Sequence, residues 1–327
     1  MLVASIITSV ATQTQLAHDQ HIVPQWHLTK FTDVDGTLWC YKRDMPVKKS
    51  CPKGECWARD FYEYEVNGKR TENRYERWLA GIEDAAAPVH EALINRQPLS
   101  HRETLVWALY VASLFLRTKK VRSQISSAMV QKFREFADSP DFVRDLQLDL
   151  FQRGDLVFTD DLKKLVERLR TDMDSSPSYH HLTSLQANTN SLAKALAGKV
   201  WHVLETAPEE FFVISDCPVT TFEFASGHYY PGPGFGKEST TVVLPMTPKC
   251  VFLASSPRGR WKPVGPPEAV HATNLLTVRF GFERVCAHVN SADVKALVDA
   301  EINRITFGRD AFVPASLPQY HPQPSGQ

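Results

Sequence analysis

SHRETLVWALYVASLFLRT, residues 100–118, is the stretch that decides the fold of this 327-residue chain. Ser100 and Glu103 match the Ser-x-x-Glu capping box, in which each side chain bonds a free backbone amide of the first helical turn. The following run, Leu105 to Leu116, is apolar nearly all round, which is typical of a helix at the centre of a core. It is too short for a bilayer, which takes about 20 apolar residues. We therefore expect a buried helix and no membrane span.

The sequence on both sides of this stretch predicts further helices. From about Glu72 the apolar residues recur at helical spacing, and Pro88 is expected to kink that helix. Amphipathic patterns predict more helices at 122–137, 140–152, 160–173, 179–198, 268–282 and 291–305.

Short β-prone segments flank the helical middle of the chain. An Asp-Gly turn at 33–36 predicts a hairpin within 21–41, and the Lys-, Pro- and Gly-rich residues 42–70 are expected to form a loop. Further strands are expected at 201–206, 211–215, 241–244, 250–254 and 284–288. These patterns predict an α+β fold, in which a helical middle block packs on a small mixed sheet formed by strands from both ends of the chain.

The domain prediction is a flexible N-terminal segment at 1–19, one α+β domain at 20–313 and a Pro-rich tail at 314–327. Lys plus Arg and Asp plus Glu both number 37, so the formal net charge is +0. A chain with this balance has no global charge for nucleic-acid binding, and partners stay unknown. The neutral charge and the lack of a clear export signal lead us to expect a cytoplasmic protein.

Three motifs suggest chemistry but do not fit their context. Cys40, Cys51 and Cys56 are too loosely spaced for a typical zinc site, so a loop with reduced thiols is the simpler interpretation. Residues 33–38, DVDGTL, match a phosphatase motif but do not follow the apolar strand that such enzymes need. Residues 232–237, GPGFGK, lack the outer glycine and the final Ser or Thr of a phosphate loop.

Several motifs occur in an order that resembles the family catalogued as domain of unknown function 4238. The opening has the form His21-x-x-Pro24-x-x-x-Leu28-x-x-Phe31. Later segments that match are 74–83, 109–118, 211–219 with its Ser-Asp-x-Pro-Val end, 244–248 and Asn274. The chain departs from the pattern at 42–70 and 231–238. The resemblance implies no established activity, so the function has to be argued from the residues.

The candidate site residues are polar residues that lie next to apolar helices and strands in the sequence. Glu76 and Glu83 are spaced to share one helical stripe with Glu72. Arg117 directly follows the apolar helix, where an unpaired guanidinium would be costly, so we expect a carboxylate partner. Asp216 ends an apolar strand, a place where sites are often built.

Two hypotheses follow from these residues. In the first, His21, Glu76, Glu83 and Asp216 are catalytic in a metal-assisted phosphoester or nucleic-acid hydrolase, and Arg117 and Asn274 bind substrate. A divalent metal ion would then be the cofactor. In the second, the chain is a non-catalytic ligand- or protein-binding module. There Glu76 or Glu83 pairs with Arg117, Asp216 caps its own turn, and this Glu–Arg–Asp network is structural. His180 and His181 are expected to be a solvated helix start.

Overall fold

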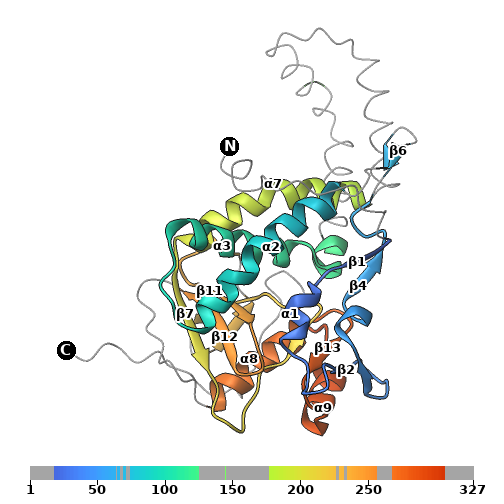
Figure 1. The fold of residues 1–327 in the computed structure, drawn as a ribbon, viewed down its shortest axis with the longest axis vertical. Helices are drawn as coiled ribbons and strands as arrows, with labels where there is room; N and C mark the ends of the chain where they lie inside the picture. Colours follow the sequence, from blue (N-terminus) through green and yellow to red (C-terminus); the bar gives the residue numbers. More distant parts are fainter. Residues whose placement is uncertain are drawn as a thin grey trace, which may run out of the picture.

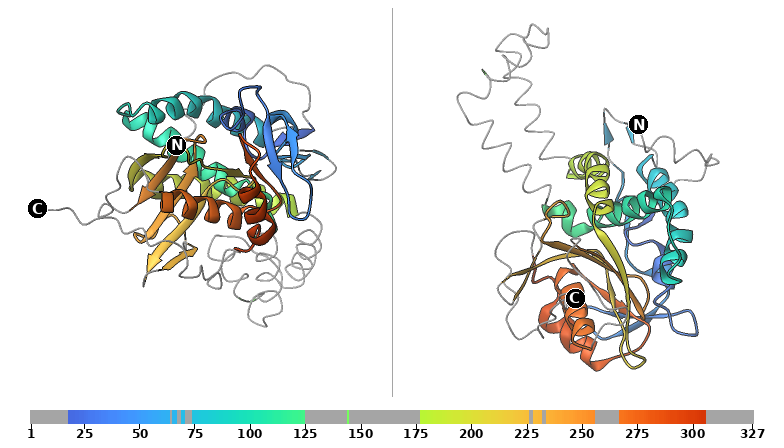
Figure 2. Two further views of the ribbon diagram at one scale, coloured as in Figure 1. Left: turned by 90° about the horizontal axis from the view of Figure 1, so that it is seen from below. Right: turned by 90° about the vertical axis from the view of Figure 1, so that its left-hand side faces the viewer.

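The computed structural model describes residues 18–63, 65–66, 69–70, 74–124, 144, 177–225, 228–231, 234–255 and 267–305. Its architecture is α+β, as the sequence predicts. Helices α2 (Arg74–Ile94), α3 (His101–Leu116) and α7 (Pro177–Ala197) lie together on one face of a five-stranded sheet (Figure 1). Helices α8 (Pro267–Phe280) and α9 (Ala292–Glu301) lie on the opposite side of that sheet (Figure 2).

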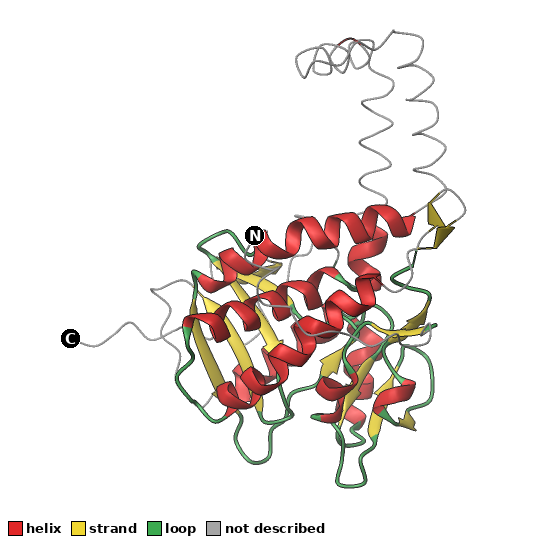
Figure 3. Cartoon of the chain, turned by 45° about the horizontal axis from the view of Figure 1, so that its top comes forward, coloured by secondary structure: helices red, strands yellow, loops and turns green. Residues whose placement is uncertain are grey.

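The five-stranded sheet has the order β10-β9-β11-β12-β7, and every neighbouring pair is antiparallel. Its strands are β7 (Val200–Glu205), β9 (Thr220–Ala225), β10 (His228–Pro231), β11 (Thr240–Pro245) and β12 (Cys250–Ser255). The two central strands, β11 and β12, are buried at every residue because helices cover both of their faces (Figure 3).

A smaller antiparallel sheet has the order β3-β2-β13-β8. It joins β2 (Leu38–Tyr41) and β3 (Lys48–Ser50) to β8 (Ile214–Ser215) and β13 (Val285–Ala287). The short helix α1 (Gln25–Thr29) packs on one face and α9 on the other. Two further strand pairs are β1 (Asp19–His21) with β4 (Trp57–Arg59), and β5 (Glu65–Val66) with β6 (Lys69–Arg70). The turn Pro52–Gly54 is a 3-10 helix.

Helix α3 is the centre of the main core, as residues 100–118 predict. Its side chains from Val106 to Leu114 are all buried, and Trp107, Tyr110 and Leu114 have no measurable exposure. The predicted capping box is present: the Ser100 hydroxyl accepts from the Glu103 amide at 3.3 Å, and the Ser100 amide donates to the Glu103 carboxylate at 2.7 Å. Among the described helices, none is both long and apolar enough to cross a membrane.

The sheets differ from the expected single mixed sheet in two respects. Each described strand pair is antiparallel, and the larger sheet is built from one stretch, 200–255, in which β9 pairs with β10 and β11 with β12 while β7 pairs with the more distant β12. Only the smaller sheet combines strands from both ends of the chain. The segment expected to open a hairpin also differs, since residues 25–29 are helical. Pro24, with φ −55°, precedes the helix and suits such a start.

The expectations for residues 42–70, for Pro88 and for the helices in the middle of the chain have different outcomes. Residues 42–70 contain the short strands β3 to β6 rather than a plain loop. Pro88 lies inside α2, which runs through it as one helix. The helices expected at 122–137, 140–152 and 160–173 fall largely or wholly outside the described residues, as do most of the N-terminal segment 1–19 and all of the tail 314–327.

Leu114→Ala should lower the free energy of unfolding by about 2–5 kcal/mol, because it opens a cavity at the centre of a packed core. Denaturation with urea measures this loss. Val34→Ala, at a fully exposed apolar residue, is the control and should stay within about 0.5 kcal/mol of wild type. A similar cost for both variants would contradict the central position of α3.

Candidate functional site

A cavity of about 230 Å³ lies where α2 and the end of α3 meet the segment around α1. Its polar wall consists of side chains from four parts of the chain: His21, Gln25, Trp26, Tyr62, Glu76, Glu83 and Arg117. A space of this size fits a small molecule or the end of a longer one.

Local structure explains how three of these charged side chains meet. Glu76 and Glu83 are seven residues apart on α2, about two helical turns, so they lie on one side of the helix. Arg117 is the C-cap of α3, and its amide still bonds the Ser113 carbonyl. Helix packing of α2 on α3 brings the two carboxylates to the guanidinium. The stripe and the cation predicted from the sequence are therefore neighbours.

Arg117 is fully buried and forms an ion pair with Glu83 through Nη1. Burial by itself would lower the Arg117 pKa. The Glu83 carboxylate outweighs this effect, with help from the Tyr62 and Tyr110 side chains, and raises the pKa above its ordinary value. The guanidinium is therefore a permanent cation. Its position at the C-terminal end of α3 also suits the helix dipole.

Five buried atoms on cavity-lining residues have no hydrogen-bond partner among the described residues. They are His21 Nε2, Trp26 Nε1, Glu76 Oε2, and Nε and Nη2 of Arg117, although the carbonyls of Lys53 and Pro52 lie beside the His21 ring and the Tyr62 hydroxyl lies beside the guanidinium. Most buried polar atoms in folded proteins are paired, because an unpaired one costs about 1–3 kcal/mol. These atoms belong to residues that line one cavity, which makes this cavity the candidate site.

Glu76 has an unusual pKa. Burial, together with the nearby Glu83 and Glu63 carboxylates, raises it to about 7, and Arg117 offsets part of the rise. Near neutral pH this carboxyl therefore exists in both its protonated and its ionised form. A group with that property can give or take a proton during a reaction.

His21 is held as a neutral ring. Burial lowers its pKa, and the backbone carbonyls of Lys53 and Pro52 offset only part of the effect. The Gln25 side-chain amide donates to Nδ1 at 3.3 Å, and the Tyr62 hydroxyl donates to the His21 carbonyl at 3.1 Å. These contacts hold the ring and the tyrosine against the cavity.

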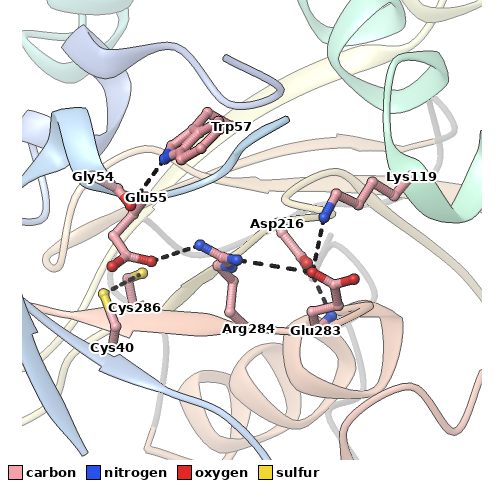
Figure 4. Close-up of polar contacts among 9 residues, drawn as sticks. All are labelled: Cys40, Gly54, Glu55, Trp57, Lys119, Asp216, Glu283, Arg284 and Cys286. Carbon is pink, nitrogen blue, oxygen red and sulfur yellow. Dashed lines mark hydrogen bonds and ion pairs between the residues drawn. The ribbon is translucent and has the colours of Figure 1, made fainter. Parts of the chain in front are cut away.

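Asp216 is not among the residues that line this cavity, and Figure 4 shows it beside Glu283 and Arg284. Its two carboxylate oxygens accept hydrogen bonds from the Phe282 amide at 2.8 Å and the Glu283 amide at 2.9 Å. Burial raises its pKa, while those amides and Arg284 act in the opposite direction. Asp216 thus caps the turn that leads into β13. The expected bond to its own turn is made instead by Ser215, whose hydroxyl accepts from the Cys217 amide at 3.3 Å.

Asn274 also lies outside the cavity. Its amide oxygen accepts from the Val213 amide at 3.0 Å, and its nitrogen donates to the Phe211 carbonyl at 2.8 Å. These bonds fasten α8 to the segment before β8, so the side chain is occupied by the scaffold. The structure therefore brings His21, Glu76, Glu83 and Arg117 together and leaves Asp216 and Asn274 apart.

The expected Glu–Arg–Asp network is present only as the Glu83–Arg117 pair. A separate chain of ion pairs surrounds Asp216: Lys119 bonds Glu283 at 2.9 Å and Arg284 bonds Glu55 at 2.7 Å (Figure 4). His181 is fully buried, contrary to the expected solvated start, because its Nε2 donates to the Leu116 carbonyl at 2.8 Å.

The motifs set aside in the sequence have structural roles. Asp33 accepts from the amides of Asp35 at 3.0 Å and Thr37 at 2.9 Å, and this turn lowers its pKa to about 2. Cys40 and Cys286 are buried thiols on paired strands, with their Sγ atoms 3.1 Å apart. In the part of the chain that the structure describes, no three His, Cys, Asp or Glu side chains are grouped so as to hold a metal ion.

Sequence reasoning missed Gln25, Trp26 and Tyr62 as lining residues. Tyr62 lies in the stretch read as a loop, and no local signal marks it. Gln25 and Trp26 could have been found by treating Pro24 as the start of a helix, because they are then the first two residues of that helix.

Asp216→Ala should lower the free energy of unfolding by about 1–3 kcal/mol, because the amides of the half-buried Phe282 and the exposed Glu283 lose their acceptor. Urea denaturation measures the loss, with Asp84→Ala at an exposed position of α2 as the control. A stability equal to that of the control would contradict the capping role.

Glu76→Gln should gain stability relative to wild type as pH rises. The folded-state pKa of Glu76, about 7, lies above the ordinary 4.5, so ionisation favours the unfolded chain. The stability from the protonated carboxyl is complete below about pH 4.5 and is lost as pH rises through 7. Urea denaturation at pH 5, 6, 7 and 8, with Asp84→Asn as background, measures the growing difference. A constant difference would show that Glu76 is not shifted.

Comparison with known proteins adds a family but no activity. No curated protein and no solved structure matches the chain. A family model described as "Protein of unknown function (DUF4238)" matches residues 19–291, which include the whole cavity and both sheets. The matched range thus contains every residue argued above to form the candidate site. This chain belongs to the DUF4238 family.

Proposed function

We propose that the cavity is the active site of a hydrolase that acts on a small phosphoester, with Glu76 as the acid–base residue. One observation carries this proposal: a buried carboxyl with a pKa near neutrality and a buried guanidinium line the same small cavity. Perturbed titratable groups in a cleft are typical of active sites. The cytoplasmic location expected from the sequence is part of this proposal.

The proposed roles follow from charge and hydrogen-bonding capacity. Arg117 would bind the non-bridging oxygens of the phosphoryl group, for which a guanidinium has a matching planar fork. Water adds to phosphorus and the bond to the leaving oxygen breaks. The Glu76 proton passes to the leaving oxygen, and a proton of the attacking water restores Glu76. Neutral His21, Gln25 and Tyr62 would orient the substrate.

The proposal differs from the sequence-based hypothesis in two ways. Asp216 is omitted, because both of its oxygens accept backbone amides elsewhere. No metal ion is included, because the Arg117 cation already lies beside the carboxylates that would bind one. The alternative, a ligand- or protein-binding module, would use the same cavity without turnover.

Glu76→Gln should reduce turnover by about 100-fold or more, since it cannot supply a proton. The assay uses p-nitrophenyl phosphate and bis(p-nitrophenyl) phosphate, each with added Mg²⁺ or Mn²⁺ and with a chelator. Wild-type turnover should fall as pH rises above about 7, where Glu76 loses its proton.

Asp84→Asn, on the exposed side of the same helix, is the matched control and should keep wild-type turnover. Turnover that survives in Glu76→Gln would contradict the assignment. A wild-type protein that hydrolyses neither substrate under any of these conditions would favour the binding module.

A further inference from the structure

The edge of the Arg117 guanidinium that faces away from Glu83 indicates which class of ligand the cavity would bind. Nη1 is used by Glu83 and the Tyr62 hydroxyl lies beside the guanidinium, whereas Nε and Nη2 make no hydrogen bond of good geometry with the described residues. These two nitrogens form the side edge of the guanidinium, which matches the two oxygens of a carboxylate or phosphate. The side chain is fully buried and lines the cavity, so this edge is shielded from bulk water.

The other unpartnered atoms complete such a site. Trp26 Nε1 is only a donor, and Glu76 Oε2 becomes a donor when the carboxyl is protonated. An oxyanion is an acceptor for all of these groups. A cationic or purely donating ligand would leave the guanidinium edge and the indole unpaired.

The charges around the cavity determine in which protonation state of Glu76 an anion can bind. Arg117 and Glu83 cancel, and His21 is neutral. Glu76 also faces the Glu63 carboxylate, which is not part of the lining and adds negative charge, and the Tyr62 hydroxyl, whose pKa burial raises. With Glu76 ionised the lining is net negative and repels an oxyanion. With Glu76 protonated the lining is neutral and offers one more donor.

We propose that the ligand of this cavity is a small molecule with a terminal oxyanion, seated on the Nε–Nη2 edge of Arg117, and that it binds together with one proton on Glu76. This rests on the proposed function in that it concerns the same site, and it names the part of the substrate that the site recognises. Carboxylates and phosphates share this chemistry. The proton is taken from solvent on binding and is the one available for transfer in the reaction.

Acetate and sulfate are suitable probes, because neither changes its charge between pH 6 and 9. Isothermal titration calorimetry at pH 6, 7, 8 and 9, in buffers of different ionisation enthalpy, measures affinity and proton uptake together. Wild-type affinity should fall about tenfold per pH unit above pH 7, as expected for uptake of one proton. Whether sulfate or acetate binds more tightly distinguishes a phosphate-type from a carboxylate-type ligand.

Two variants and a control make the result specific. Glu76→Gln keeps the shape and a donor but cannot ionise, so its affinity should be independent of pH. Arg117→Lys keeps the charge but lacks the fork, so affinity at pH 6 should fall at least about tenfold. Asp84→Asn should bind like wild type. Near-UV circular dichroism of each variant confirms that it is folded.

The inference is overturned if wild type binds neither probe at pH 6, if its affinity does not change with pH, or if Glu76→Gln keeps the wild-type slope. Lack of any effect in folded Arg117→Lys would also overturn it. Its failure is separable from that of the hydrolase. If phosphoester turnover needs Glu76 but binding is not linked to proton uptake, the hydrolase proposal holds and the oxyanion inference fails. Proton-linked binding without turnover would leave only the oxyanion site.

Discussion

The burial of one guanidinium at the end of an apolar helix is the constraint on which the rest of this structure depends. Arg117 follows a helix with its side chains buried from Val106 to Leu114, so the chain cannot turn away to solvent at that point. A buried cation without a carboxylate would be strongly destabilising. Glu83 supplies that partner, and it can do so because the apolar face of α2 packs against α3. The same packing brings Glu76, His21 and Tyr62 to the cavity.

The residues around Arg117 connect this region to the rest of the fold. The Leu116 carbonyl accepts from His181 on α7, and Lys119 pairs with Glu283 beside the turn that Asp216 caps. Lys120 donates to the Phe280 carbonyl at the end of α8. Asp216 therefore holds the turn that carries Glu283, the partner of Lys119, and its carboxylate has this structural role outside the cavity.

Much of the fold could be predicted from local patterns. The capping box of α3, the helical period of α2 and the short apolar strands of the second half are all where the sequence placed them. The failures occur where two local signals compete. The β-prone residues 25–29 form a helix because Pro24 and the buried ring of His27 favour it, and His27 bonds the Pro245 carbonyl at 2.9 Å from a distant strand. That contact cannot be read from neighbouring residues.

By itself, the sequence determined that Glu76 and Glu83 share a helical face, that Arg117 needs a carboxylate, and that Asp216 ends an apolar strand. Each statement depends on spacing of a few residues along one element, which the backbone geometry of helices and strands controls. Only the tertiary structure decided that Glu83 is the partner, that Glu76 is left unpaired beside it, and that Asp216 is used by the turn at 281–284. Those outcomes depend on the packing of segments far apart in the chain, because burial and neighbouring charge, rather than residue type, set what each carboxylate can do.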